Sequence, residues 1–204
     1  MNLSSFFNDK NVVITGHTGF KGSWLSQILS QLGANIYAFS LDIPTNPAHY
    51  ELLEVKFCRD ERIDLADNSK VSNFIIESQP DFVFHLAAQA LVRPAYASPT
   101  DTWLTNAMGT INVLESLRLL KCPCVAVLIT SDKCYDNVEW VWGYRETDAL
   151  GGPDPYSASK GAAELAIRSY VRSFFLNDGL VRIGVGRAGN VIGGGDWAED
   201  RIVP

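Results

Sequence analysis

The stretch Asn11-Val-Val-Ile-Thr-Gly-His-Thr-Gly-Phe-Lys-Gly22 decides the fold of this chain. Its apolar run, 11–15, predicts a buried strand, and a stretch of helical period follows over residues 22–32. The glycines between them let the backbone turn sharply and approach a pyrophosphate, which the free N–H groups of a helix start can bind. We interpret this segment as a dinucleotide-binding loop in preference to a simple tight turn. The residues predicted to bind the cofactor here are Gly16, His17, Thr18, Gly19, Phe20, Lys21 and Gly22.

Outward from this loop, short apolar runs alternate with longer stretches of helical period. Strands are predicted at 11–15, 35–41, around Ile63, and at 81–86, 125–130 and 181–187, and helices at 22–32, 68–77, 102–120 and 156–175. The first helix is predicted to bury Trp24, Leu25, Ile28, Leu29 and Leu32 and to stop at Gly33. The alternation predicts a doubly wound, Rossmann-type α/β fold whose parallel sheet is covered on both faces.

The composition excludes several classes of protein. The chain has 204 residues, with 17 Lys and Arg against 23 Asp and Glu, a net charge of −6 and 47% hydrophobic residues. It is too apolar to be disordered, and it has no excess of positive charge with which to hold nucleic acid or an anionic membrane. A basic leader and an apolar run of the ~18 residues that span a bilayer are both missing, so we expect a cytoplasmic protein.

Cysteine content and chain ending carry two further expectations. The cysteines Cys58, Cys122, Cys124 and Cys134 are too few for a disulfide scaffold, and no second Cys/His pair completes a zinc site, so no metal is predicted. The chain stops at Arg201-Ile-Val-Pro204 without a closing helix. We therefore expect a fragment, with a nucleotide-binding domain over 1–187 and the beginning of a smaller substrate-binding domain over 188–204.

Residues that follow the predicted strands are the next candidates for the cofactor site, because ligands of such sheets bind beyond the carboxyl ends of the strands. Asp42 closes the second strand, where a carboxylate can accept hydrogen bonds from a ribose. It would repel a 2′-phosphate, and no arginine follows in the loop, so NAD is favoured over NADP; the alternative is a solvated turn residue before Pro44. The side chains of His17 and His85 are interpreted as structural. Further predicted cofactor residues are Asp64, Leu65, Leu86, Ala87, Ala88 and Gln89.

A phenol and an ammonium stand four residues apart in Tyr156-Ser-Ala-Ser-Lys160, which places them on one face of a helix. A fixed cation favours the phenolate and is expected to lower the pKa of the tyrosine toward that of a general base. By itself the spacing is also typical of an exposed helix pair. The polar cluster Thr130-Ser-Asp-Lys133 at the end of the fifth strand would face the same cleft, which favours the catalytic interpretation.

These motifs resemble a known family. Together with His85-Leu-Ala-Ala88, Asn106 in Thr-Asn-Ala-Met-Gly-Thr and Arg187-Ala-Gly-Asn190, they are similar to the extended short-chain dehydrogenase/reductases that act on nucleotide sugars, over essentially the whole chain. The run Gly-His-Thr-Gly-Phe-Lys-Gly-Ser-Trp (16–24) and the pair Asp132-Lys133 narrow the resemblance to the 4,6-dehydratases of CDP-glucose. Enzymes of the dTDP-glucose branch carry Asp-Glu at that pair.

The resemblance implies an internal redox cycle with NAD as cofactor. Tyr156, assisted by Ser131 and Lys160, would remove the C4 hydroxyl proton while hydride passes to NAD⁺. Lys133 would then take the C5 proton, Asp132 would protonate the leaving C6 hydroxyl, and hydride would return to C6. A neutral Lys133 and a protonated Asp132 both require a poorly hydrated pocket. The alternative for this pair is a surface ion pair at a strand end.

The resemblance also implies further contacts and partners. Asn106, Thr130, Tyr156 and Lys160 would contact the cofactor, and the substrate-binding residues would be Arg93, Ser131, Asn190, Trp197 and Arg201. For Arg93 the alternative is an exposed helix-capping role. A homodimer or higher homo-oligomer and a place in deoxysugar and lipopolysaccharide O-antigen biosynthesis are expected by the same analogy. The alternatives are a nucleotide-sugar 4-epimerase or reductase of the same family, and a non-catalytic NAD-binding regulatory domain.

Overall fold

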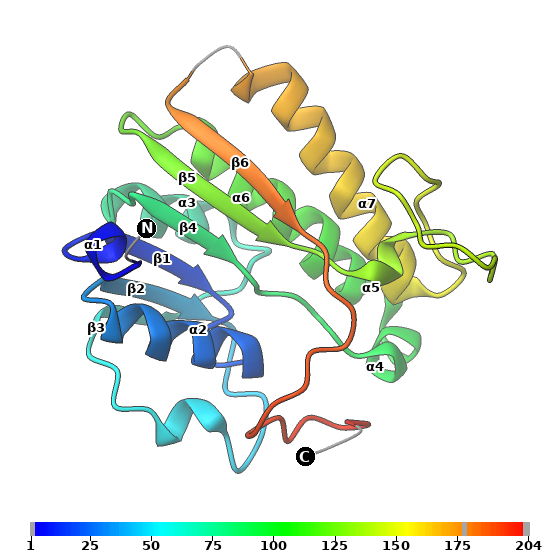
Figure 1. Cartoon of the computed structure of the whole chain (residues 1–204), viewed down its shortest axis with the longest axis horizontal. Helices are drawn as coiled ribbons and strands as arrows, with labels where there is room; N and C mark the ends of the chain where they lie inside the picture. Colours follow the sequence, from blue (N-terminus) through cyan, green and yellow to red (C-terminus); the bar gives the residue numbers. More distant parts are fainter. Residues whose placement is uncertain (1–2, 177–178, 202–204) are drawn as a thin grey trace.

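The computed structural model of the chain describes residues 3–176 and 179–201 and shows a twisted parallel sheet flanked by helices (Figure 1). Its strands lie in the order β3-β2-β1-β4-β5-β6, and every neighbouring pair is parallel. This order is that of a doubly wound dinucleotide-binding sheet, with the switch point between β1 and β4. The Rossmann-type prediction is confirmed. The strands are β1 (Asn11–Thr15), β2 (Asn35–Ser40), β3 (Phe57–Arg62), β4 (Phe82–His85), β5 (Cys124–Ile129) and β6 (Val181–Gly186).

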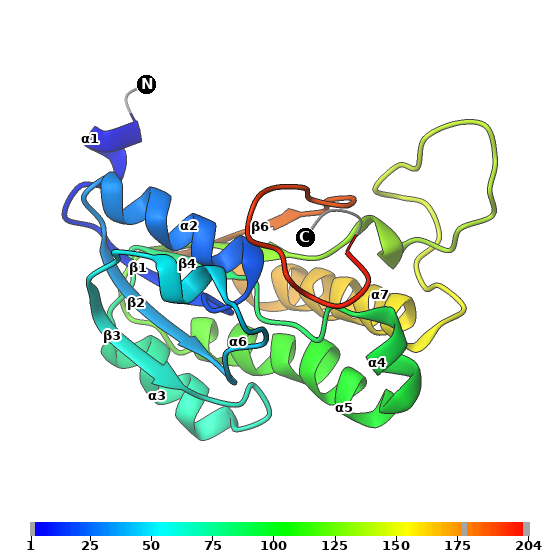
Figure 2. The same cartoon turned by 90° about the horizontal axis from the view of Figure 1, so that it is seen from below.

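The helices divide between the two faces of the sheet (Figure 2). The α-helices are α1 (Leu3–Phe7), α2 (Phe20–Gln31), α3 (Asn68–Glu77), α4 (Val92–Ala97), α5 (Pro99–Trp103), α6 (Gly109–Arg118) and α7 (Pro155–Tyr170). Two short 3-10 helices, η1 (His49–Leu52) and η3 (Asp132–Cys134), and two π segments, η2 (Leu104–Met108) and η4 (Val171–Phe175), complete the described elements. Helix α2 covers one face, and α3, α6 and α7 cover the other.

Coverage of the sheet is less complete than predicted. On the α2 face, the described residues leave the far part of the sheet open, and Val125 of β5 is 40% exposed there. The reason is topological: α2 follows β1 and lies over β1 and β2, whereas the helices after β4 and β5 both return on the opposite face. The prediction of two covered faces is therefore wrong for the β5 side of the described chain.

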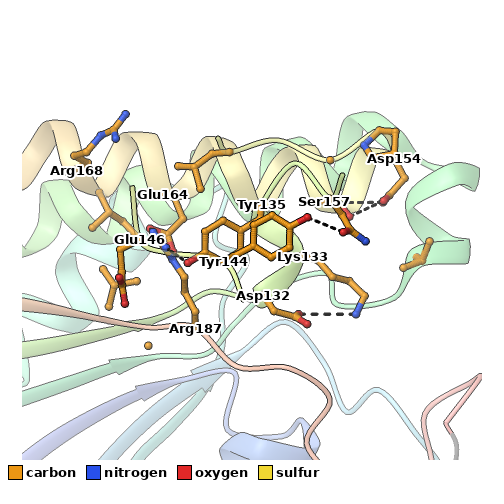
Figure 3. A pocket seen from close by; sticks show the side chains of 18 of the residues that line it. Asp132, Lys133, Tyr135, Tyr144, Glu146, Asp154, Ser157, Glu164, Arg168 and Arg187 are labelled. Carbon is orange, nitrogen blue, oxygen red and sulfur yellow. Dashed lines mark hydrogen bonds and ion pairs between the residues drawn. The ribbon is translucent and has the colours of Figure 1, made fainter. Parts of the chain in front are cut away.

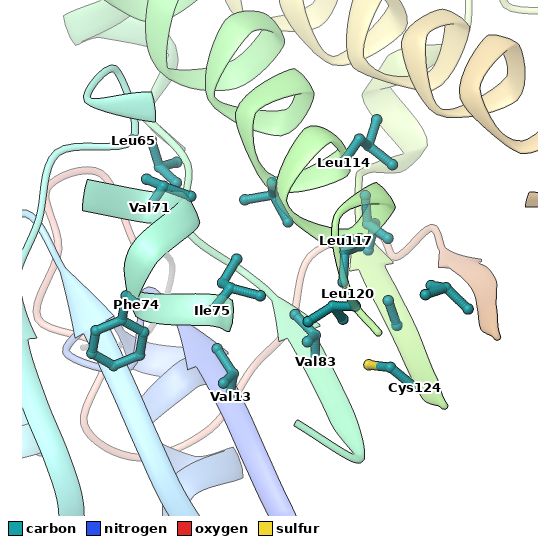
Figure 4. Close-up of a cluster of buried hydrophobic side chains, with 14 of the residues drawn as sticks. Val13, Leu65, Val71, Phe74, Ile75, Val83, Leu114, Leu117, Leu120 and Cys124 are labelled. Carbon is teal, nitrogen blue, oxygen red and sulfur yellow. The ribbon is translucent and has the colours of Figure 1, made fainter. Parts of the chain in front are cut away.

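The larger hydrophobic core lies between the sheet and helices α3, α6 and α7 (Figure 4). Fully buried aliphatic and aromatic side chains from both layers meet there, and burying each one stabilises the fold by about 1.5–3 kcal/mol. They include Val13, Phe74, Ile75, Val83, Leu114 and Leu117. A smaller cluster around Val12, Ile14 and Leu29 lies beneath α2. The core thus fixes the carboxyl ends of the strands as a rigid edge.

Helix α2 buries only part of the predicted face, since Leu29 is buried and Leu25 and Leu32 pack against the cluster around it. Its buried residues are Gly22, Ser23, Ser26 and Leu29, whereas Trp24 and Ile28 are 41% and 49% exposed. Small residues allow the helix to approach the loop and the sheet closely, so Ser23 and Ser26 turn inward and satisfy their hydroxyls on backbone carbonyls of the helix. The predicted stop is correct, because Gly33 follows the cap with a φ of +84°, a conformation that favours glycine.

Two other boundaries differ from the prediction. The third strand ends at Arg62, before the predicted position of Ile63. The prediction missed it because the charged residues Arg59, Asp60 and Glu61 of this edge strand give it the sequence pattern of a loop. The helix predicted at 102–120 begins earlier, at Pro99, and contains the π segment η2. Helix α4 precedes it without having been predicted.

The structure also bears on the cysteines, on a metal site and on membrane-spanning helices. All four cysteines are free, and burial raises the pKa of Cys124 to about 12 and that of Cys134 to about 11. Within residues 3–176 and 179–201, no cluster of His, Cys, Asp and Glu has the makings of a metal site. The helices of the same residues are too short or too polar to cross a membrane.

Candidate active site

The glycine loop packs backbone against backbone. A Cβ on Gly16, whose φ is +76°, would lie 2.7 Å from the backbone nitrogen of Ala87, and one on Gly22 would lie 2.1 Å from the carbonyl oxygen of Gly16. Neither position admits a side chain. At Gly19 the nearest atom to such a Cβ is the Gly16 carbonyl oxygen, at 3.4 Å, which is ordinary contact. The fold therefore requires Gly16 and Gly22, and it leaves room beside Gly19.

The loop is tied to the end of β2 through His17, whose side chain is fully buried. Its ring hydrogen-bonds Ser40 and Asp60, both at 3.0 Å, and burial lowers the pKa of His17 while the nearby Asp60 raises it in part. The structural interpretation of this side chain is confirmed. Thr18 donates through its hydroxyl to the backbone oxygen of Asp42 at 2.6 Å, and the carboxylate of Asp42 is exposed beyond the strand.

His85 is the centre of a buried network between β1, β4 and α6. The Thr15 hydroxyl lies 2.7 Å from His85 Nδ1 and also accepts from the Ala87 amide. His85 Nε2 lies 3.3 Å from Thr110 Oγ1. Burial, with a smaller contribution from Lys160, lowers the pKa of His85 to about 3. The ring is therefore neutral and structural, as predicted, and it fixes the backbone at Leu86 and Ala87 beneath the glycine loop.

Asn106 joins two parts of the site. Its side chain accepts from the Gln89 amide at 2.9 Å and donates to the Gln89 carbonyl oxygen at 3.0 Å and to Ser159 Oγ on α7 at 2.9 Å. It lies in the π segment η2, and π segments are frequent at functional sites. Its side-chain groups bind protein here, so its predicted cofactor contact remains a prediction. Of the pair after β3, Leu65 is buried in the core and Asp64 is exposed.

Helix α7 carries three buried polar residues at one-turn intervals: Tyr156, Lys160 and Glu164. Burial raises the pKa of Tyr156, and a hydrogen bond with Ser131 lowers it only in part. Burial, together with the neighbouring Lys21 ammonium, lowers the pKa of Lys160 to about 8. The prediction of a lowered phenol pKa is thus wrong for this structure, because burial has the largest effect and the nearby carboxylates of Asp132 and Asp154 raise the pKa further. The shared helix face is confirmed.

The turn that carries the predicted acid and base lies directly after β5. Ser131 caps the short helix η3, accepting from the Lys133 amide at 3.2 Å and donating to Asp132 Oδ1 at 3.0 Å. The side chains of Asp132 and Lys133 are 54% and 43% exposed, with their charged groups 3.9 Å apart. The poorly hydrated pocket expected around them is absent from the described residues, because the turn lies at the open edge of the sheet.

A buried network beside this turn was not foreseen from the sequence. Glu164 accepts from the Thr130 hydroxyl. It also forms a two-pronged ion pair with Arg187, which in turn donates to the Tyr135 hydroxyl (Figure 3). This network borders a cavity of about 1300 Å³ that Asp132 and Lys133 also line. The signal available in the sequence was the continuation of the four-residue spacing from Tyr156 through Lys160 to a third polar residue.

The segment after β6 runs back toward α2 (Figure 1) and engages most of the predicted substrate residues. Trp24 donates to the carbonyl oxygen of Gly194 at 3.0 Å. Arg201 pairs with the buried carboxylate of Asp196 at 2.9 Å, and Arg93 pairs with Asp200 at 3.1 Å. Asn190 accepts from Lys133 over a long 3.5 Å, and Trp197 is half-buried. Residues 202–204, part of the predicted second domain, lie outside the described residues.

The strand order, the glycine loop at β1 and the Tyr-x-x-x-Lys helix beside β5 define a Rossmann-type nucleotide-binding protein. The family model of GDP-mannose 4,6 dehydratase matches residues 13–181, and the chain belongs to that family.

The chain is also similar to individual proteins of known name or structure. It is 50% identical, over 98% of its length, to a CDP-glucose 4,6-dehydratase of Salmonella typhimurium, of which it covers 57%. Its fold matches the epimerase Mth375 of Methanothermobacter thermautotrophicus with a TM-score of 0.80 at 24% identity, over 96% of this chain and 56% of that one. A UDP-glucose 4-epimerase of Thermus thermophilus, solved in complex with NAD, matches with a TM-score of 0.69 at 26% identity, over 87% and 53%. The chain thus spans little more than half the length of these relatives.

Proposed function

We propose that the whole protein is an NAD-dependent 4,6-dehydratase that converts CDP-glucose to CDP-4-keto-6-deoxyglucose. The observation that carries the proposal is the turn Ser131-Asp132-Lys133, an acid and a base side by side at the carboxyl end of β5, packed against the helix of Tyr156 and Lys160. The half-identical relative from Salmonella typhimurium bears the name of this activity and supports the CDP-sugar over other nucleotide sugars.

The glycine loop fits a dinucleotide. The room beside Gly19, at the start of α2, lets a pyrophosphate approach backbone N–H groups that have no partner within the helix. Asp42 is exposed beyond β2, where a ribose hydroxyl would be bound, and the Thermus thermophilus relative holds NAD. Lys160, whose lowered pKa leaves it cationic at neutral pH, would hold a further ribose hydroxyl. The redox chemistry at sugar C4 and C6 is what NAD supplies when bound.

Each acid–base step has a residue in this chain. Tyr156 takes the proton of the C4 hydroxyl, and Ser131 holds that hydroxyl. The resulting ketone acidifies the C5 proton, which Lys133 removes while Asp132 gives a proton to the departing C6 hydroxyl, so that water leaves. For Tyr156, the substrate and the cation of Lys160 must lower a pKa that burial alone has raised. For Lys133 and Asp132, the bound sugar itself must exclude water from two exposed side chains.

The remaining assignments belong to the same proposal. Arg93, Asn190, Trp197 and Arg201 bind the nucleotide sugar, with the two arginines directed at its phosphates and Trp197 stacked on the base. The protein works in the cytoplasm as a homodimer or higher homo-oligomer, in deoxysugar and O-antigen biosynthesis.

The test is the reaction itself, run on the full-length protein with CDP-glucose and NAD. We expect the alkali-induced absorbance of a 4-keto-6-deoxy sugar, which Tyr156→Phe abolishes. With dTDP-glucose in place of CDP-glucose, the rate is expected to fall. Release of a sugar inverted at C4 instead would identify an epimerase, and tight NAD binding without turnover of any nucleotide sugar would identify a regulatory domain.

A further inference from the structure

One buried ion pair joins the elements that surround the acid–base turn. Glu164 lies on α7 and Arg187 follows β6, and their side chains are 5% and 18% exposed. Arg187 Nε lies 2.7 Å from Glu164 Oε1, and Nη2 lies 2.8 Å from Oε2. A two-pronged pair of this kind fixes orientation as well as distance. Because desolvation offsets most of the attraction between buried charges, such a pair adds little net stability, and its main effect is on geometry.

The pair holds the turn from both flanks. On one flank the Thr130 hydroxyl donates to Glu164 Oε1. On the other, Arg187 Nη1 donates to the Tyr135 hydroxyl, and the Arg187 guanidinium lies 4.9 Å from the centre of that ring (Figure 3). Ser131, Asp132 and Lys133 are the residues between these two anchors together with Cys134. Residues 130–135, here called the arch, therefore carry the acid and the base, and both ends of the arch, Thr130 and Tyr135, hydrogen-bond the Glu164–Arg187 pair.

The Tyr135 end of the arch depends on the ion pair more than the Thr130 end does. Thr130 also receives a sheet hydrogen bond, since its amide donates to the Gly186 carbonyl oxygen at 2.9 Å. Tyr135 lies beyond the sheet and is held by Arg187, by stacking on Tyr144 with ring centres 5.1 Å apart, and by a bridge to Leu150. Loss of the Arg187 contact is thus expected to move the Lys133 end of the arch and to leave β5 in place.

We propose that Glu164 and Arg187 are positioning residues that set Asp132 and Lys133 against the Tyr156 face of α7. This inference rests on the proposed dehydratase function. Tyr156 and Lys160 lie on the same helix as Glu164, whereas Lys133 lies in the arch, which is also tied by the Asp132 amide to the Ala188 carbonyl oxygen at 3.1 Å. A misplacement of about 1 Å costs about 100-fold in rate. Weakening the pair therefore slows C5–C6 elimination more than oxidation at C4.

The first experiment separates the two steps in the full-length protein. Single turnovers of CDP-glucose in D₂O report C4 oxidation by the absorbance of reduced nicotinamide and elimination by deuterium at C5. In Glu164→Gln, elimination is expected to slow about 10- to 100-fold while C4 oxidation changes less than about threefold. Arg187→Lys and Tyr135→Phe, which retain the charges, are expected to slow elimination by about three- to tenfold. The matched control is Glu115→Gln, which removes the acid of an exposed pair with Arg118 on α6 and is expected to change neither step.

The second experiment does not depend on the substrate. Cys134 lies within the arch and is fully buried, so the rate at which N-ethylmaleimide labels it, measured by mass spectrometry of its peptide, reports opening of the arch. Labelling is expected to accelerate at least about tenfold in Arg187→Lys and Tyr135→Phe and to stay unchanged in Glu115→Gln. These two variants keep the Glu164 carboxylate, which itself raises the pKa of the thiol.

The outcomes distinguish the two proposals. An equal slowing of both chemical steps, or unchanged elimination in Glu164→Gln, overturns the positioning role even in a working dehydratase. If the wild-type protein produces no 4-keto-6-deoxy sugar, the proposed function is wrong, and the labelling decides alone: unchanged Cys134 labelling in Arg187→Lys and Tyr135→Phe overturns the arch, and faster labelling supports it.

Discussion

The glycine loop after β1 and the acid–base turn after β5 stand at the same edge of one sheet, yet they are held by different means. In the loop, backbone packs so closely on backbone that a Cβ on Gly22 would lie 2.1 Å from the Gly16 carbonyl oxygen, and the one histidine of the loop is fully buried. In the turn, the Glu164–Arg187 side-chain pair adds to backbone hydrogen bonds such as that from the Asp132 amide to the Ala188 carbonyl oxygen, and the charged groups of Asp132 and Lys133 reach solvent.

The difference fits what each region is proposed to bind. A dinucleotide is recognised at its pyrophosphate by N–H groups, which need only a fixed backbone. Proton transfer at a sugar carbon needs two side chains at defined positions, and those positions can be set only by other side chains. The two regions should therefore respond differently to substitution, and four predictions, from the largest expected effect to the smallest, test this contrast.

Lys133→Ala should have the largest effect, confined to one step. Loss of a general base slows proton transfer by about 10²- to 10⁴-fold, so C5 proton removal should slow by that factor while NAD binding stays nearly unchanged. Deuterium exchange at C5 and a cofactor titration measure the two. Lys70→Ala, at an exposed lysine paired with Asp67 on α3, is the control. Normal C5 exchange in Lys133→Ala would exclude this lysine as the base.

Two glycine substitutions should separate fold from binding within the loop. Gly22→Ala forces a methyl onto the Gly16 carbonyl oxygen and is expected to lower the free energy of unfolding by about 3 kcal/mol. Gly19→Ala meets only a 3.4 Å contact, so its cost should stay below about 1 kcal/mol while the Kd for NAD rises at least about tenfold. Chemical denaturation and cofactor titration of both variants provide the comparison. Equal destabilisation by both would contradict the distinction.

Acid should lower the free energy of unfolding through His85, which lies beneath the glycine loop. Its pKa is about 3 in the folded state against 6.5 for the unfolded side chain, so below pH 6.5 the unfolded chain binds a proton that the folded chain does not. The free energy of unfolding should therefore fall as the pH falls toward 3, by about 2 kcal/mol between pH 6.5 and 5 from this group. Denaturant curves at pH 7 and pH 5 measure it. His85→Gln should remove that part of the slope and leave the share of His17; an unchanged slope would disprove the assignment.

Arg93→Ala should have the smallest effect on stability. Its ion pairs with Glu199 and Asp200 tie the segment after β6 to α4, and the Arg93 side chain is 74% exposed. Exposed pairs contribute about 0–1 kcal/mol, so the change in Tm should be slight and should vanish in high salt. A KM for CDP-glucose that rises without a change in Tm would support the proposed phosphate contact, and an unchanged KM would remove it.

Local patterns were enough to predict much of the candidate site. The spacing of Tyr156 and Lys160 predicted a shared helix face, and the run after β5 predicted a polar turn at the sheet edge; both are present. The role of Glu164 was missed, although it continues the same spacing, because its meaning depends on Arg187, 23 residues away. The pKa of Tyr156 was predicted in the wrong direction because burial cannot be read from the motif.

The sequence alone determined the parallel α/β order, the glycine loop and the position of most strands, because each depends on residues close together in the chain: apolar runs, helical period and glycines without a Cβ. Tertiary structure decided which face of α2 is buried, how wet the Asp132–Lys133 turn is, and what holds it in place. Those properties depend on desolvation and on contacts between residues far apart in sequence, and both exist only once the chain has folded.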